Sequence, residues 1–246
     1  MNQCNEKLKG RVHSFQSLGT VDGPSVRSVI FMQGCPLRCV CCHNPDTWDF
    51  AGGEEVTADE LVIKVLRYKS YYGAEGGVTV SGGEPLMQAE FLVELFQKLK
   101  NYDIHTALDT SGCILNENVK ELLEYTDIVL LDFKYTNSED YLKYTKMEME
   151  KAQEFLDYLQ EENKRTWLRY VVIPNLNDGK EDIAKLFDLK NKYPCVEKIE
   201  LLPFRKLCLE KYDEMGIDFP LKDTPEAKQS FIDEIYKQYE KGTQLS

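Results

Sequence analysis

The sequence of 246 residues lacks the features that place a protein in a membrane, outside the cell or on nucleic acid. No apolar run approaches the roughly 18 residues that indicate a membrane-spanning helix, and the start, MNQCNEKLKGRVHSF, has no apolar segment of the kind that a signal peptide needs. Basic residues are not in excess either. The net charge of −12 argues against broad binding to nucleic acids or membrane surfaces, because phosphates are bound by cationic side chains. We therefore expect a cytoplasmic protein.

Repeats, low-complexity tracts and linkers rich in proline, glycine or serine are also absent. Short apolar segments rich in β-branched residues instead alternate with amphipathic ones. The apolar segments predict buried strands at 26–33, 77–82, 104–109, 127–133, 166–174 and 196–203. The amphipathic segments predict helices after a capping box at Thr57 and Glu60 and at 89–100, 150–160, 181–190 and 229–239. This order predicts an α/β fold, a partial (β/α)6 barrel of parallel strands with outer helices; an open doubly wound sheet is the alternative.

Polar and metal-binding residue types follow the predicted strands. In parallel α/β folds the chemistry gathers at the carboxyl ends of the strands, so these residues are expected to lie near one another. In strand order they are the cysteine-rich loop from Cys35, the segment SGGEP at 81–85, Asp109 and Thr110, Asp132 to Lys134, Arg169 on the fifth strand, and Arg205 after the sixth.

Eight cysteines are present, and four of them fall within eight residues, at Cys35, Cys39, Cys41 and Cys42. In a reducing cytosol, clustered cysteines indicate metal ligands or catalytic thiols rather than disulfides. The other four are scattered, and we expect them to be inert structural thiols, because buried free cysteine is common in proteins. These four are Cys4, Cys113, Cys195 and Cys208.

The spacing C-x3-C-x2-C of Cys35, Cys39 and Cys42 provides three thiolates and no fourth. An iron–sulfur cluster usually takes four cysteines, so three would leave one iron open to another ligand, as a catalytic metal site requires. A zinc site that uses His43 as its fourth ligand is the alternative, but Cys42 and His43 are adjacent and would have to turn toward the same ion.

The loop GCPLRCVCCHNPDTW, together with SGGEP, resembles the radical S-adenosylmethionine (AdoMet) superfamily. More narrowly, the chain resembles the activating enzymes of glycyl radical enzymes in segments that run from about residue 10 to 205. These segments are GRVHSFQSLGTVDGPSVRSVIFMQGC, CCHNPDTW, VTVSGGEP, HTALDTSG, LLDFKY, RYVVIP and VEKIELLPF. The resemblance implies a single domain over 1–246, with a core at about 10–205 and a C-terminal helical extension at 206–246.

The resemblance also implies that Cys35, Cys39 and Cys42 hold a [4Fe–4S] cluster. Cys41 makes a second register of the third ligand possible; we favour Cys42, because the spacing and the following His43 match the family. Cys41 and His43 are then expected to contact AdoMet, Cys41 through its backbone. The segment Gly82, Gly83, Glu84 is expected to bind the amino group of AdoMet: paired glycines allow close backbone approach, and a carboxylate accepts bonds from an ammonium group.

The remaining residues that the resemblance implies around AdoMet come from later strand ends. Asp109, Thr110 and Asp132 are expected to hold a monovalent cation beside the AdoMet carboxylate, although solvated carboxylates are the simpler interpretation of their spacing. Lys134 and Arg169 are expected to neutralise that carboxylate, or else to pair with the aspartates. Phe133 and Arg205 complete the predicted cofactor contacts, and Asp22 resembles a residue near the target peptide.

The chemistry that the resemblance implies is reductive cleavage of AdoMet to a 5′-deoxyadenosyl radical, which abstracts a glycine Cα hydrogen from a partner enzyme. Such an oxidoreductase needs flavodoxin or ferredoxin as electron donor and anaerobic conditions. Pyruvate formate-lyase is the favoured partner, because no cysteine lies between Cys42 and Gly82 to supply the extra clusters of other activases. Departures at Ser25 and Arg205 leave another glycyl radical enzyme open. A non-catalytic iron–sulfur or zinc protein is the alternative from another class.

Overall fold

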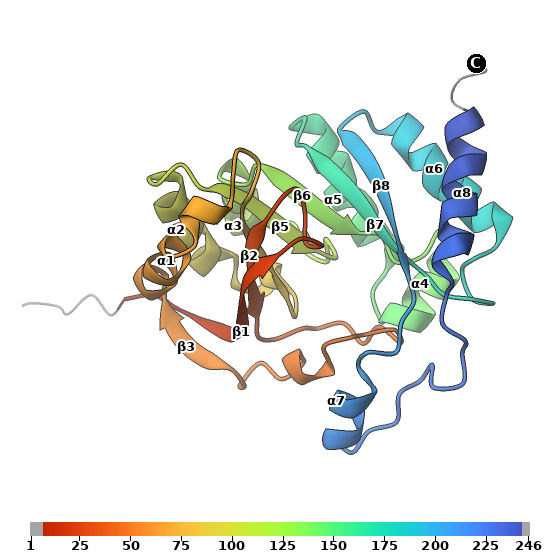
Figure 1. Ribbon diagram of the computed structural model, residues 1–246, viewed down its shortest axis with the longest axis horizontal. Coiled ribbons are helices and arrows are strands. Elements are labelled where there is room, and N and C mark those ends of the chain that lie inside the picture. The colour runs from red at the N-terminus through yellow and green to blue at the C-terminus, as the bar shows by residue number, and fades with distance from the viewer. Residues whose placement is uncertain (1–6, 243–246) are drawn as a thin grey trace, which may run out of the picture. The chain divides into compact units, whose positions relative to one another are not determined.

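The computed structural model describes residues 7–242 (Figure 1). The chain forms two compact units. The first consists of Met1–Pro36 and Thr47–Leu130, and the second of Leu37–Asp46 and Leu131–Ser246. The cysteine-rich loop and strand β6 (Ile128–Asp132) therefore each contribute to both units. The single domain expected from the sequence stays a prediction.

The first unit contains the strands in the order β3-β1-β2-β4-β5, followed by the beginning of β6. Strands β2, β4 and β5 are parallel to one another, whereas β1 is antiparallel to both β2 and β3. The elements are β1 (Lys9–Gly19), β2 (Arg27–Met32), β3 (Glu54–Thr57), α1 (Ala58–Leu66), η2 (Lys69–Tyr71), β4 (Gly77–Gly82), η3 (Pro85–Gln88), α2 (Ala89–Lys100), β5 (His105–Thr110) and α3 (Glu117–Glu124), with η1 (Pro45–Thr47) at the unit boundary.

The second unit contains the end of β6 and two further strands, β7 and β8, which are parallel. The backbone N–H of Phe133 donates to the carbonyl of Arg169 over 2.9 Å, which holds the segment after β6 beside β7. The remaining elements are α4 (Ser138–Thr145), α5 (Met149–Glu161), β7 (Thr166–Val172), α6 (Lys180–Lys192), β8 (Val196–Pro203), α7 (Leu209–Glu214) and α8 (Gln229–Gly242).

The predicted strands and helices are confirmed to within two or three residues at each end. The parallel strands are long apolar runs because both of their faces are covered: Val29, Ile30, Val78 and Val80 are all fully buried. The capping box predicted before α1 is also present, with Thr57 N–H donating to Glu60 Oε2 over 2.7 Å.

Strands β1 and β3 and helices α3, α4 and α7 were not predicted from the sequence. Strand β1 is missed because it is only half covered and its apolar residues are few, so the run of apolar residues typical of a central strand is not there. Helices α3 and α4 each begin at an asparagine: the side chain of Asn116 accepts from Val119 N–H and that of Asn137 from Asp140 N–H. In the described part of the chain, no helix is both long enough and apolar enough to cross a membrane.

Candidate active site

The cysteine-rich loop follows β2, and backbone hydrogen bonds join its first residues to the residues at its end. Gly34 has a φ of +92°, a conformation that favours glycine. Its N–H donates to Thr47 O over 2.8 Å, and the N–H of Cys35 donates to Trp48 O over 3.4 Å. The two ends of the loop are thereby held together in the first unit, with Cys35 at its start.

The SGGEP segment packs directly against the beginning of this loop. The N–H of Gly83 donates to Met32 O and that of Glu84 to Gly34 O, both over 2.8 Å. Neither glycine leaves room for a side chain, because an added Cβ would lie 2.3 Å from Met32 N at Gly82 and 2.4 Å from Gly34 O at Gly83. The two motifs from the sequence are therefore joined backbone to backbone, and the glycines are needed for that contact.

The carboxylate of Glu84 is almost completely buried and accepts four hydrogen bonds within the first unit. Leu86 N–H (3.1 Å) and Thr110 Oγ1 (2.5 Å) donate to Oε1. The N–H (3.0 Å) and hydroxyl (2.5 Å) of Ser111 donate to Oε2. A carboxylate has about four acceptor positions, so the side chain of Glu84 is fully used in tying the SGGEP segment to the end of β5. The predicted contact of this segment with the amino group of AdoMet stays a prediction.

Two of the three oxygen groups predicted to hold a cation lie at the end of β5 in this unit. The hydroxyl of Ser81 donates to Asp109 Oδ2 over 2.6 Å, and Thr110 is buried and bonded to Glu84. Asp132, the third predicted group, belongs to the second unit. The cation site stays a prediction.

The backbone around Asp22 is held by hydrogen bonds that involve Thr79 and the fully buried Arg27. The carbonyl of Asp22 accepts from Thr79 Oγ1 over 2.6 Å, and the same hydroxyl oxygen accepts from Arg27 Nε over 2.7 Å. Arg27 also donates to Pro24 O in the same segment. Burial lowers the pKa of Arg27 to about 10, against the opposing effect of Asp127, so the guanidinium stays charged near neutrality.

In the second unit, the segment with Cys39, Cys41 and Cys42 is anchored to the last turn of α4. The N–H groups of Arg38 and Val40, on either side of Cys39, donate to Thr145 O (2.9 Å) and Tyr144 O (3.0 Å). A turn follows, in which Cys42 N–H donates to Cys39 O over 3.1 Å. These bonds bring Cys39 and Cys42 to the two ends of one turn, as the C-x2-C spacing requires.

The imidazole ring of His43 contacts the segment that follows β8. Its Nε2 lies 2.8 Å from Arg205 O and donates to that carbonyl, because a carbonyl only accepts. The guanidinium of Arg205 points to another segment, donating to Ala227 O over 2.6 Å and lying 3.7 Å from Glu226. The predicted AdoMet contacts of both residues stay predictions.

Lys134 and Asp132 form an ion pair after β6. Burial acts to lower the pKa of Lys134, but the carboxylate of Asp132 and the nearby thiols of Cys39 and Cys41 outweigh it, so that the pKa is raised well above its usual value. Burial also raises the pKa of Cys41 to about 11, although Lys134 acts in the opposite direction. The charged groups predicted on β6 thus lie beside the cysteine-rich segment, within the second unit.

Arg169, on the neighbouring strand β7, is buried and pairs with a residue that the sequence analysis did not single out. Its Nε lies 3.2 Å from Glu200 Oε2 on β8. Glu200 and Ser111 are the two site residues that were missed. Ser111 could have been found from the sequence, because it directly follows the predicted site residue Thr110. Glu200 becomes a candidate only once the register of β7 and β8 is known.

Two of the four cysteines outside the loop have the burial that is expected of structural thiols. Cys195 and Cys208 are buried, and burial raises the pKa of both. Cys113 is half-buried, and Cys4 lies outside the described residues. No three His, Cys, Asp or Glu side chains within residues 7–242 are grouped closely enough to hold a metal ion as they stand. The ligand set Cys35, Cys39 and Cys42 is therefore still a prediction, and Cys35 and the other two belong to different units.

The chain is similar to enzymes whose names describe one activity. The profile of the Radical SAM superfamily matches residues 29–187. The pyruvate formate-lyase-activating enzyme of Clostridium pasteurianum is 46% identical over 217 residues, which cover 88% of this chain and 91% of that one. The enzyme of the same name from Staphylococcus epidermidis is 42% identical over 238 residues, 94% of this chain and 95% of that one.

Solved structures agree on the fold. A domain of pyruvate-formate lyase-activating enzyme from Bacteroides vulgatus has a TM-score of 0.55 and 22% identity, covering 66% of this chain and 91% of that chain. At this level of identity the likeness concerns the fold alone. Together with the parallel strands and surrounding helices, it confirms the predicted α/β partial-barrel class.

Proposed function

Because the chain belongs to the radical S-adenosylmethionine (radical SAM) superfamily, we propose that it activates pyruvate formate-lyase by abstracting a glycine Cα hydrogen from it. The family implies a [4Fe–4S] cluster and AdoMet. The observation that carries the proposal is the pair of backbone bonds, Gly83 N–H to Met32 O and Glu84 N–H to Gly34 O, which place the SGGEP segment against the start of the cysteine-rich loop.

The chemistry of the donor groups supports both the cluster and AdoMet. Three thiols at Cys35, Cys39 and Cys42 suit a cluster with one iron left for AdoMet, which when bound is the source of the 5′-deoxyadenosyl radical. The half-buried backbone of Gly82 and Gly83 has no side chain that would obstruct a ligand, and Glu84 keeps that backbone in place through Thr110 and Ser111. The half-buried Lys134 and the buried Arg169 are cations suited to the AdoMet carboxylate.

Within the same proposal, Asp109, Thr110 and Asp132 hold a monovalent cation, and flavodoxin or ferredoxin supplies the electron. Asp22, whose turn is shaped by Arg27, lies near the partner's peptide. The protein works in the cytoplasm under anaerobic conditions. Pyruvate formate-lyase is preferred over other glycyl radical enzymes because relatives of that name match nearly the whole chain at 46% and 42% identity.

The test is anaerobic reconstitution of the purified protein with iron and sulfide, followed by AdoMet and dithionite, with and without pyruvate formate-lyase. We expect 5′-deoxyadenosine in both reactions and a glycyl radical signal in electron paramagnetic resonance only with the partner. Absence of 5′-deoxyadenosine would refute radical chemistry and favour a non-catalytic iron–sulfur or zinc protein. Cleavage without a glycyl radical would leave the superfamily in place and refute the choice of partner.

The matched control for the cluster ligands is a cysteine outside the loop. Replacing Cys35, Cys39 or Cys42 by alanine is expected to abolish the iron–sulfur absorption, whereas Cys195→Ala, which alters a buried thiol directly before β8, is expected to retain it. Iron content and visible absorption report on this independently of activity.

A further inference from the structure

Arg169 and Glu200 are direct partners on adjacent parallel strands. The register of β7 and β8 pairs them, and Arg169 Nε lies 3.2 Å from Glu200 Oε2. Their side chains are only 9% and 18% exposed, so the pair is formed largely out of water. A guanidinium in such a place needs a compensating anion, because burial of an unpaired charge is very unfavourable.

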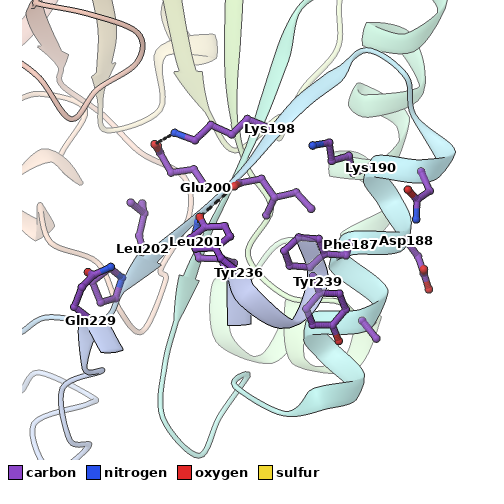
Figure 2. Close-up of a pocket in the computed structure, with 14 residues that line it drawn as sticks. Phe187, Asp188, Lys190, Lys198, Glu200, Leu201, Leu202, Gln229, Tyr236 and Tyr239 are labelled. Atoms are coloured by element: carbon purple, nitrogen blue, oxygen red, sulfur yellow. Dashed lines mark hydrogen bonds and ion pairs between the residues drawn. The ribbon is translucent and has the colours of Figure 1, made fainter. Parts of the chain in front are cut away.

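The other carboxylate oxygen of Glu200 faces a lysine at the surface. Lys198 Nζ donates to Glu200 Oε1 over 2.7 Å and lies 4.2 Å from the centre of the Trp167 ring. Figure 2 shows this pair on β8, beside a cavity of about 900 Å³ formed with α6 and α8. Lys198 is 45% exposed. Glu200 therefore stands between a buried arginine and a half-exposed lysine, and uses one oxygen for each.

The contact through Nε limits how the guanidinium can turn. A guanidinium is planar, and its five N–H donors have fixed directions relative to one another. Rotation about the last side-chain bonds would carry Nε away from the carboxylate with which it forms an ion pair at 3.2 Å. The ion pair therefore favours one range of orientations, and the directions of the two terminal nitrogens follow from it. The backbone of Arg169 is also held, since its carbonyl accepts from Phe133 N–H beside Lys134.

We propose that Glu200 is a positioning residue, whose carboxylate holds the guanidinium of Arg169 in the orientation that pairs with the carboxylate of AdoMet. The inference rests on the proposed function, because it takes Arg169 as a ligand of AdoMet. Lys198 balances the charge of Glu200 from the outer side and does not orient Arg169.

Two substitutions separate orientation from charge. Glu200→Gln removes the charge but keeps an amide oxygen at the same reach, beside Nε. Glu200→Asp keeps the charge, which compensates the buried arginine, but is one methylene too short to hold Nε at the same place. Lys198→Met is the matched control, because it replaces the ammonium group that contacts Glu200 and Trp167 by an unbranched apolar side chain and leaves Arg169 and Glu200 unchanged.

The affinities for AdoMet and for decarboxylated AdoMet are measured by calorimetry on the anaerobically reconstituted protein without reductant. The melting temperature of each variant is measured in parallel. We expect Glu200→Asp to weaken AdoMet at least fivefold with little change in melting temperature. Glu200→Gln should stay within threefold of the wild type for AdoMet but melt at a lower temperature. Decarboxylated AdoMet, which has no carboxylate for Arg169, should change by less than twofold in all variants, and Lys198→Met should bind both ligands as the wild type does.

Equal losses for both ligands would mean that Glu200 only maintains the fold, and would overturn the proposal. So would a normal AdoMet affinity in Glu200→Asp together with a weak one in Glu200→Gln, because charge alone would then be the cause. A wild-type protein that neither binds nor cleaves AdoMet would instead refute the proposed function, which these variants do not test.

Discussion

Replacing Gly83 by alanine is expected to separate the SGGEP segment from the cysteine-rich loop. The added Cβ would lie 2.4 Å from Gly34 O and 2.8 Å from Gly34 C, and both are backbone atoms that cannot rotate away. An ordinary contact begins at 3.4 Å, so the two backbones must move apart by roughly 1 Å at this point. The bonds from Gly83 N–H to Met32 O and from Glu84 N–H to Gly34 O, now 2.8 Å, then exceed the length of a hydrogen bond.

The expected loss of stability follows from these contacts. Two backbone hydrogen bonds contribute about 1 kcal/mol each to the net free energy of folding. Forcing a methyl group into a packed position costs about 1–3 kcal/mol. We therefore expect the free energy of unfolding to fall by about 3–5 kcal/mol, and the displaced loop to bind AdoMet poorly even where the cluster is retained.

The assay is equilibrium unfolding in urea, combined with 5′-deoxyadenosine formation by the reconstituted variant. Gly179→Ala is the matched control, because Gly179 has an ordinary φ of −64° and its Cβ would meet only the end of the Asp182 side chain, at 3.2 Å. That variant should unfold within about 0.5 kcal/mol of the wild type. If Gly83→Ala were as stable as Gly179→Ala and equally active, the close backbone contact would not be needed and our account of the paired glycines would be wrong.

Three further predictions concern a helix cap, a titrating carboxylate and the cluster register. Thr57→Ala removes the cap of α1 and should lower the free energy of unfolding by about 1 kcal/mol in urea, with no loss of iron. Burial acts to raise the pKa of Asp127, but hydrogen bonds from Lys100 and from the backbone N–H of Thr106 outweigh it, so the pKa is lowered in the folded protein. Asp127 therefore stabilises the fold at a pH above its unfolded-state pKa, and this stabilisation is lost as the pH falls through its folded-state pKa. The stability difference between wild type and Asp127→Asn, measured by urea unfolding, should therefore shrink from about pH 6 to about pH 3; a constant difference would contradict this. Cys42→Ala should lose the iron–sulfur absorption and Cys41→Ala should keep it, and the reverse result would move the third ligand to Cys41.

Most of the elements around the site could be predicted from the sequence, because their signals are local. Buried parallel strands are continuous apolar runs, and the capping box at Thr57 and Glu60 spans only four residues. The C-x3-C-x2-C spacing likewise needed no fold to indicate three thiolates. Strand β1 was missed because it is antiparallel and only half covered. Its sequence therefore lacks the continuous run of apolar residues that marks a buried parallel strand.

The contacts of individual site residues could not be predicted, because their partners lie far away in the sequence. The contact of Gly82, Gly83 and Glu84 with the amino group of AdoMet, which the resemblance implies, stays a prediction. That Thr110 and Ser111 donate to the Glu84 carboxylate could not be predicted, because the pairing of β4 and β5 brings them beside it. Glu200 resembled any other polar residue of a strand until the register of β7 and β8 set it opposite Arg169. Cysteine spacing and strand periodicity are properties of consecutive residues and can be read directly. Which buried carboxylate meets which donor depends on strand register, which arises only when segments distant in sequence pack together.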